Sequence, residues 1–557
     1  MTGLTAPGLG PLVGHVTHDT ARIWVRAHQE TDREIIDDAN SRTLGVLTVL
    51  SEGNSRYQRG EAPCFYFRLR REFSRTGTIT LGEAINGWKG KAFSLKPDTR
   101  YVLRVGVLTL DDPNPFFDSM DWSDLVTRLP DVTAWEDDLR QLPAEESEAA
   151  FFTFPEPKDM GRFKFLLGSC RYPGIDWKQR KSDEIFGPMA ERSTRRDGAR
   201  FALMVGDQIY ADTLNRFIPI GRADTFEEFE ERYVSAYGSP NMRRLLRHTP
   251  TYMILDDHEI EDNWDTERLK KDGGHRLFTL ATDAYMSYQW SHGPRSFGKR
   301  FYYQFDYGRF PFFVLDTRTQ RYFAGDSKVM KNRHMLGAPT RPGVPPGQLV
   351  RLLDWLGAMQ KQRKNVPKFV VSPAVFVPSP VSAAEDRATD AEKIASDSWP
   401  AFIETKRAIL RYIVDNQIQN VVFLSGDIHC ANISQIRFDG SAKARKLKTF
   451  AVTSSAFYWP FPFADGEPSE FVHDSASEDD ADTFDVDPDA GIKMDYVTDS
   501  FTQDDNFAQI TVDAAAQSMR VEFFNKKGTI VEEEEWMGLF KPPRKTKLSK
   551  VLKFAAF

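Results

Sequence analysis

Six short apolar segments of this chain each stop on a polar side chain suited to metal or phosphate binding. They read FKFLLGSC, ARFALMVGDQIY, TYMILDDHE, FFVLDTR, KFVVSPAV and NVVFLSGDIH. Runs of this length that are rich in Val, Leu, Ile and Phe are typical of strands buried on both faces of a sheet. Ligand sites in open α/β sheets lie beyond the carboxyl ends of the strands, so we expect these side chains to meet in one pocket.

The residues that end the six segments have a common chemistry. They are Cys170, Asp207 and Tyr210, Asp257 and His258, Asp316 and Arg318, Ser372, and Asp427 and His429. Thiolate, phenolate, imidazole and carboxylate groups bind metals, and Arg binds planar oxyanions through two hydrogen bonds. We therefore predict a metal site built for phosphate chemistry.

Each of these residues also has an ordinary structural interpretation. A Gly-Asp pair after a strand is commonly a turn or a helix cap, and Cys170 alone is typical of a small buried hydrophobe. An ion pair with an Asp at a loop base would account for Arg318. Within DDHE we expect Asp257 to bind metal, with Asp256 as its rival, and His258 to be a general acid oriented by a nearby carboxylate. The presence of ligands at several strand ends favours the chemical interpretation.

The chain divides into regions with different patterns. Residues 8–155 alternate apolar and polar side chains between turn signals, which predicts an all-β domain of the fibronectin-III or immunoglobulin type. The alternative is a set of β-hairpins that decorate the main domain. Residues 160–540 alternate strand-like and helical segments, which predicts an α/β core, an α+β sandwich of mixed, largely parallel sheets flanked by helices. FAQITVDA and SMRVEFFN are expected to form an antiparallel hairpin at a sheet edge.

Two segments are expected to pack loosely. Residues 474–490 are acidic and poor in apolar side chains, which predicts a mobile loop. Residues 541–557 form a basic tail with a short apolar tip, which we expect either to dock as a terminal helix or to lie on an acidic surface.

Charge and cysteine content exclude several classes of protein. The 557 residues carry a net charge of −7, and no basic nucleic-acid-binding surface is evident. Three cysteines cannot all pair, so no disulfide framework is implied. No apolar run is long enough for a membrane span, and the first residues lack the features of a signal peptide. We expect a cytoplasmic protein; an exported form with its signal removed is the alternative.

The ordered set GSC, GDxxY, DDHE, LDxR and SGDxH resembles the alkaline phosphatase D (PhoD-like) family of metallophosphatases, within the calcineurin-like and purple acid phosphatase superfamily. Shared segments such as RHMLGAP and FPFFVLDTR strengthen the resemblance, which covers about residues 8–535. The wider superfamily has Asn where this chain has Asp257 and His where it has Asp427. These departures match the PhoD-like branch.

The resemblance implies a centre that contains Fe³⁺ and Ca²⁺, although other divalent metals are possible. Carried over by position, iron would be held by Cys170, Asp207, Tyr210 and His429. Asp207 would bridge, and calcium would be held by Asp257 and Asp427. Ligand chemistry agrees, because thiolate, phenolate and imidazole suit a transition metal, whereas carboxylates suit a hard cation.

These residues predict a metal-dependent phosphoric ester hydrolase, a phosphatase or phosphodiesterase. We expect the dinuclear centre to activate a hydroxide for in-line attack on phosphorus, with Arg318 offsetting charge on the phosphate and His258 protonating the leaving group. Its partner would be a small-molecule or lipid phosphate mono- or diester. A phospholipase D-like phosphodiesterase and a non-enzymatic metal-binding scaffold are the alternatives.

Overall fold

Two large mixed β-sheets form the body of the molecule in the computed structural model. The structure describes residues 3–27, 41–82, 85–86, 92–112, 114, 116–117, 119–173, 180–212, 221–339, 345–383, 388–460, 471, 475, 483–535 and 544–557. The predicted strands FKFLLG, ALMV, TYMI, FPFFV, KFVVS and VVFLS are all present, as β12, β13, β14, β16, β19 and β20.

The first large sheet carries three of the predicted strand ends. Its parallel strands β12, β13 and β14 span Phe163–Gly168, Ala202–Val205 and Thr251–Ile254. Beyond β12 the sheet continues with the antiparallel strands β25, β26 and β29, which span Phe507–Asp513, Ser518–Phe524 and Ser549–Lys553. Every residue of β13 and β14 is buried, as expected for short apolar strands covered on both faces.

The second large sheet carries the other three strand ends. Its central strands β16, β19, β20 and β22 are parallel and span Phe310–Val314, Lys368–Ser372, Val421–Ser425 and Thr449–Thr453. Antiparallel strands flank them, β15 on one side and β21, β24 and β23 on the other, which span Tyr303–Tyr307, Ala431–Asp439, Ile492–Thr502 and Phe484–Asp487. The expectation of mixed sheets is confirmed: parallel strands lie at one edge of the first sheet, where β14 is the last strand, and at the centre of the second, and antiparallel strands complete both.

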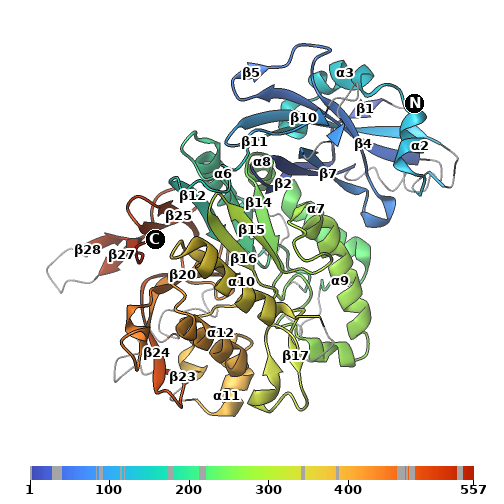
Figure 1. The fold of residues 1–557 in the computed structure, drawn as a ribbon. Coiled ribbons are helices and arrows are strands. Elements are labelled where there is room, and N and C mark those ends of the chain that lie inside the picture. The colour runs from blue at the N-terminus through green and yellow to red at the C-terminus, as the bar shows by residue number, and fades with distance from the viewer. Residues whose placement is uncertain are drawn as a thin grey trace.

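The two sheets pack face to face through an aromatic core. The ring of Phe165 from the first sheet lies 5.6 Å from that of Phe312 in the second, which stacks on Phe369 at 4.5 Å. Helices cover both outer faces, with α6–α9 on the first sheet and α10 and α12 on the second (Figure 1). Their bounds are Phe186–Thr194, Phe226–Gly238, Pro240–His248, Gly274–Tyr288, Gln348–Arg363 and Ile403–Asp415. This layering directs the carboxyl ends of both sets of parallel strands to the site described below.

The larger sheets of the N-terminal region are two antiparallel ones at one end of the molecule (Figure 1). One consists of β2, β3 and β7, with bounds Leu9–Val16, Thr20–Arg26 and Thr76–Gly82. The main strands of the other are β4, β6, β10 and β11, with bounds Ser41–Glu52, Cys64–Arg68, Arg100–Asp111 and Glu148–Phe152. The hydroxyl of Tyr101 accepts a hydrogen bond from the Lys96 amide at 2.9 Å, as in the tyrosine corner of sandwich domains.

Among the described residues of this N-terminal region lie three short α-helices, although the sequence predicts only strands there. They are α2, α3 and α4, with bounds Trp122–Thr127, Glu136–Gln141 and Ala144–Ser147. Leu125 and Leu139 pack against the N-terminal sheet that contains β4 and β10. The helices therefore cover apolar surface that the strands leave open. The assignment of this region to a fibronectin-III or immunoglobulin-like domain stays a prediction.

The C-terminal segments pack more tightly than the sequence predicts. FAQITVDA and SMRVEFFN form the antiparallel pair β25 and β26, but β29 lies beyond β26 at the sheet edge. The basic residues 544–553 therefore form strands rather than a helix, because β29 pairs with the exposed edge of β26. Of the acidic segment 474–490, most residues before 483 lie outside the described residues, whereas Phe484–Asp487 forms β23 and pairs with β24. No helix among the described residues is long and apolar enough to cross a membrane.

Candidate metal centre

The predicted ligands leave their strands through an unusual backbone conformation. Cys170, Asp207, Asp427 and His429 have positive φ angles of 57°, 55°, 73° and 51°. A left-handed conformation costs a non-glycine residue about 1 kcal/mol or more, and such residues cluster at functional sites. Gly206, directly before Asp207, has φ 91°, and a Cβ there would lie 2.4 Å from the Cβ of Asp256. Glycine is therefore needed where the GDxxY and DDHE motifs pass each other.

The GSC, GDxxY and SGDxH motifs converge at the first part of the centre. The Cys170 thiol lies 3.3 Å from Asp207 Oδ2 and 3.5 Å from the carbonyl oxygen of Asp427, two residues before His429. Tyr210 comes from the same loop as Asp207 and is 1% exposed. We call Cys170, Asp207, Tyr210 and His429 the Cys170 cluster.

Several donor atoms of the Cys170 cluster are buried without a hydrogen bond. Within the described part of the chain, Tyr210 Oη and both ring nitrogens of His429 have no hydrogen-bond partner. Such orphaned polar atoms cost about 1–3 kcal/mol each and are rare in native proteins. A metal ion bound by these atoms would remove that cost, so the donor set fits a cation.

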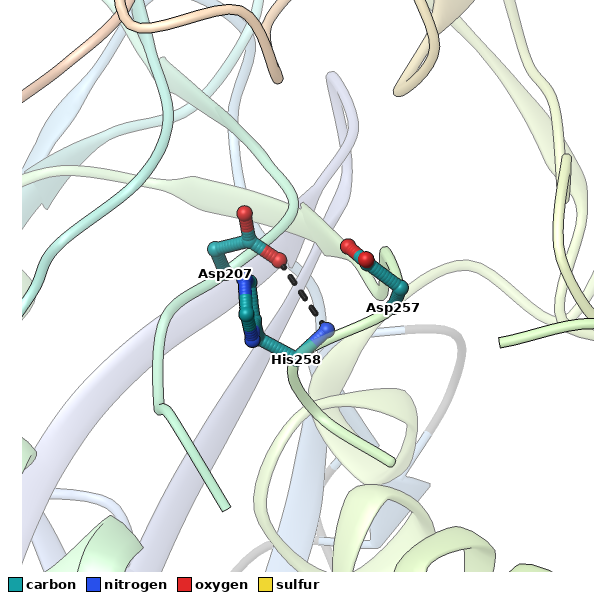
Figure 2. Close-up of side chains that lie close together, drawn as sticks. All are labelled: Asp207, Asp257 and His258. Atoms are coloured by element: carbon teal, nitrogen blue, oxygen red, sulfur yellow. Dashed lines mark hydrogen bonds between the residues drawn. The ribbon is translucent and has the colours of Figure 1, made fainter. Parts of the chain in front are cut away.

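The DDHE and SGDxH motifs supply a second group of ligands. Carboxylate oxygens of Asp256, Asp257 and Asp427 lie within 4.8 Å of one another, and we call these three residues the Asp257 cluster. One possible ligand atom from each of Asp207, Asp257 and His258 also lies within 4.8 Å of the others. Asp207, a member of the Cys170 cluster, is therefore close to Asp257 and links the two clusters. Figure 2 shows the Asp207 and Asp257 carboxylates side by side, with the backbone amide of His258 donating to Asp207 Oδ1 at 3.4 Å.

Arg318 is fully buried beside the Asp257 cluster. Its guanidinium donates to both carboxylate oxygens of Asp256 and, at 2.7 Å, to Asp397. It also lies 3.5 Å from Asp257 Oδ1 and 3.8 Å from Asp427 Oδ1. The prediction that Arg318 contacts phosphate stays a prediction; in the structure its donors point at carboxylates. The LDxR aspartate has a local role, because Asp316 caps the backbone amides of Arg318 and Thr319.

His258 has the oriented ring that a general acid needs. Its Nδ1 contacts both oxygens of the buried Asp212 carboxylate, at 2.8 and 3.0 Å. Although burial opposes the charged form, the Asp212 and Asp257 carboxylates raise the pKa of His258 well above its ordinary value. Its ring lies 4.3 Å from that of Tyr210, which fixes its tilt within the centre.

Burial controls the protonation of the Cys170 cluster. It raises the pKa values of the Cys170 thiol, the Asp207 carboxyl and the Tyr210 phenol well above their usual range, and neighbouring acids add to the effect. Burial also lowers the pKa of His429 to about 3, which keeps the ring neutral, as a metal ligand must be. Without a cation the protein thus opposes the anionic forms that metal ligands require.

Three structural supports of the centre were not predicted from the sequence. The Glu259 carboxylate accepts hydrogen bonds from the backbone amides of Asp207, Gln208 and Asp256 at 2.8–3.0 Å. Gln289, at the end of α9, donates to the same carboxylate at 3.1 Å. Trp459 stacks on His429 with ring centres 3.8 Å apart. Glu259 is part of the DDHE motif and could have been proposed from the sequence, whereas neither Gln289 nor Trp459 belongs to a motif.

Ser372 has structural contacts, as do two arginines and several aromatic residues near the strand ends. Ser372, at the end of KFVVSPAV, donates to the Ala374 carbonyl and accepts from Trp399. Arg171 is buried and donates to Ala236 and Ser239, and Arg321 donates to backbone carbonyls. The buried aromatics Tyr285, Tyr288 and Trp399 belong to the hydrophobic cores rather than to a substrate surface.

The centre opens into a cavity of ≈ 860 Å³. Its floor includes Asp207, Asp257, His258, Asp427 and His429. One wall is apolar, with Val375, Pro378, Val381 and Phe471, and the rim carries Asp262, Glu392 and Asp397. The volume lies within the range typical of small-molecule sites, about 300–1,000 Å³.

Known proteins resemble this chain in sequence and in fold. The family model of PhoD-like phosphatases matches residues 170–523. Alkaline phosphatase D of Bacillus subtilis (strain 168) is 24% identical over 234 residues, which make up 40% of this chain and 38% of that protein. The matched segment thus spans well under half of that relative.

Solved structures extend the likeness to the whole chain. A structure of PhoD matches with a TM-score of 0.61 and 14% identity, over 99% of this chain and 91% of that one. A purple acid phosphatase from yellow lupin (Lupinus luteus) seeds matches with a TM-score of 0.53 and 12% identity, over 95% and 73%. At such identities these matches show the fold. Because the family model covers more than half of its residues, the chain belongs to the PhoD-like phosphatase family.

Proposed function

We propose that this protein hydrolyses phosphoric esters at a centre that holds two metal ions. The observation that carries the proposal is the Cys170 cluster, where the buried Tyr210 phenol and His429 imidazole have no hydrogen-bond partner among the residues that the structure describes. Cys170, Asp207, Tyr210 and His429 would hold a transition metal such as Fe³⁺, and Asp257 and Asp427, with Asp207 bridging, would hold a hard cation such as Ca²⁺. Bound metals would neutralise phosphate oxygens and generate a nucleophile from water at neutral pH.

The chain's own residues would orient and protonate the substrate. Asp212 holds Nδ1 of His258, which leaves Nε2 to give a proton to the oxygen of the leaving group. Arg318 lies behind the Asp257 cluster and would keep its carboxylates ionised. Glu259 would fix the loops that carry Asp207 and Asp256, so that the ligands need little rearrangement when they bind a metal.

A phosphodiester substrate is the second candidate, and the shape of the cavity favours it. The apolar wall of Val375, Pro378, Val381 and Phe471 offers a surface for a second ester substituent beside the centre. A monoester has a single ester substituent, whereas a diester has a second one that could pack against this wall. Diesters with an apolar group, including lipid diesters, would then be hydrolysed faster than monoesters.

A paired assay tests both proposals. Natively purified protein is analysed for its metals and assayed with p-nitrophenyl phosphate and with bis(p-nitrophenyl) phosphate. We expect hydrolysis of at least one ester, with a higher kcat/KM for the diester. Metal-loaded protein without activity on either ester would refute the hydrolase and support a metal-binding scaffold.

A further inference from the structure

A second cleft lies between the N-terminal strands and the end of α9, and it shares no lining residue with the metal-centre cavity. It has a volume of ≈ 320 Å³. Strands β6 and β7 line one side, and α9 and the short helix η5 (Trp290–His292) line the other. Three arginines are among its lining residues, Arg68, Arg70 and Arg295, and its described lining contains no carboxylate.

A fourth arginine increases the positive charge behind this cleft. Arg22 Nη2 donates to the carbonyl of Ser291, a lining residue, at 2.6 Å, while its Nε is buried without a hydrogen-bond partner. Burial and the nearby Arg295 lower the pKa of Arg22 to about 10. In the described part of the chain neither Arg22 nor Arg295 forms an ion pair with a carboxylate. Two neighbouring guanidinium groups without a counter-ion are unfavourable unless an anion joins them.

The remaining lining offers apolar surface and a free hydroxyl. Arg295 lies over the ring of Trp290, 4.7 Å from its centre, and Phe73 is 38% exposed at the same cleft. Thr78 Oγ1 is buried without a hydrogen-bond partner among the described residues. Arg70 pairs with Glu72 at 3.3 Å, but both side chains are half-exposed, and such surface pairs contribute little. Arg70 is therefore free to turn toward a ligand.

We propose that this cleft binds a small organic phosphate, with the phosphate between Arg70 and Arg295 and an aromatic or apolar group against Trp290 and Phe73. A phosphate monoester carries nearly two negative charges and three acceptor oxygens, so it can engage more than one guanidinium at once. A carboxylate has a single charge and is satisfied by one arginine. The size of the cleft fits a ligand of one ring plus a phosphate, at the lower end of small-molecule sites.

Binding of phenylphosphonate, which phosphatases cannot hydrolyse, tests this proposal by titration calorimetry. All measurements use the full chain with Asp207→Asn, because loss of that ligand removes anion binding at the metal centre and leaves the cleft intact. Benzoate serves as the carboxylate probe of the same shape. Arg295→Gln removes one cleft charge, and Arg445→Gln removes one exposed arginine elsewhere as the matched control.

We expect saturable binding of phenylphosphonate that is tighter than that of benzoate. Arg295→Gln should weaken it by about tenfold, as expected for loss of a charge-assisted hydrogen bond, whereas Arg445→Gln should leave it unchanged. Absence of saturable binding, equal affinity for benzoate, or unchanged affinity in Arg295→Gln would each overturn the proposal. None of these results depends on whether the metal centre is catalytic.

Discussion

The two clusters of the candidate metal centre differ in how the protein balances their charge. The Asp257 cluster already has a cation, because Arg318 lies within 3.8 Å of Asp257 and Asp427 and donates to Asp256. The Cys170 cluster has no ion pair with an arginine or lysine among the described residues, which also leave Tyr210 Oη and the His429 nitrogens without hydrogen-bond partners. The charges of the Asp257 cluster are therefore balanced before a metal binds. The polar atoms of the Cys170 cluster gain partners only when a metal is present.

This contrast separates two kinds of ligand residue. The ligands of the Cys170 cluster are buried and form no ion pair with an arginine or lysine among the described residues, so their loss should affect metal binding more than the stability of the metal-free protein. Residues around the Asp257 cluster are held by ion pairs, so their loss should affect folding itself. Variants of the Cys170 cluster should therefore mainly lose metal binding, whereas variants around the Asp257 cluster should mainly lose stability in the metal-free protein.

Asp207 lies in the Cys170 cluster and next to the Asp257 cluster, so its replacement should have the largest effect on metal binding and activity. Asp207→Asn removes the carboxylate that links the two clusters, so both metal loading and ester hydrolysis should be lost, with kcat reduced by about 10³-fold or more. The control is Asp262→Asn, which changes an acid at the cavity rim. Metal analysis and the two-ester assay measure both effects. Turnover like that of the unchanged protein in Asp207→Asn would refute the site.

Arg318 tests the charge balance of the Asp257 cluster. Arg318→Met leaves buried carboxylates without their cation, and we expect the free energy of unfolding of metal-free protein to fall by about 3–5 kcal/mol. Arg318→Lys keeps the charge but loses the planar fork, so it should cost less. Chemical denaturation of both variants gives the values. If the methionine variant unfolds at the same denaturant concentration as the unchanged protein, Arg318 does not balance this cluster.

Glu259 should have a smaller effect that reaches both clusters. Glu259→Gln keeps the size of the side chain but replaces one carboxylate oxygen, so it weakens the hydrogen bonds that hold Asp207 and Asp256. We expect metal affinity to fall by about 10–100-fold, as for other residues that support metal ligands. Glu267→Gln, at a surface ion pair, is the control. Equal metal affinity in both variants would show that Glu259 does not position the ligands.

Replacement of Tyr210 should change stability least, but the change should have opposite signs in metal-free and in iron-loaded protein. Tyr210→Phe removes a buried hydroxyl that has no partner in the metal-free protein, so metal-free stability should stay equal or rise. Iron-loaded protein should lose stability and any visible charge-transfer band from a phenolate ligand. Thermal unfolding with and without metal, together with absorption spectra, checks this. A colourless iron-loaded protein with tyrosine in place would exclude Tyr210 as a ligand.

The strand ends were predictable from sequence because two local signals coincide there. A buried strand is a short apolar run, and a ligand residue directly after it stands out, as Cys170 does after FKFLLG and Asp427 after VVFLS. Parallel pairing then brings the ends together without further information. The N-terminal helices and β29 were not predictable in this way, because the apolar surfaces that they cover are formed by distant strands.

Apart from Glu259, the supports of the centre carry no local signal. Asp212 holds His258 across the fold, and Asp397 pairs with Arg318 from a loop 79 residues away. Trp459 is an aromatic residue in a segment without a motif, and only the fold brings it onto His429. The four carboxylate neighbours of Arg318 come from three separate loops, so the sequence did not indicate its ion pairs.

Anomalous diffraction from crystals of natively purified protein tests the central claim most directly. Data collected across the iron absorption edge should show one strong peak bonded to Cys170 Sγ, Tyr210 Oη and a ring nitrogen of His429, at about 2.0–2.3 Å. A second, lighter cation should lie among the carboxylates of Asp207, Asp257 and Asp427. A fully loaded protein whose metal lies elsewhere, with the thiol and imidazole still free, would contradict the account.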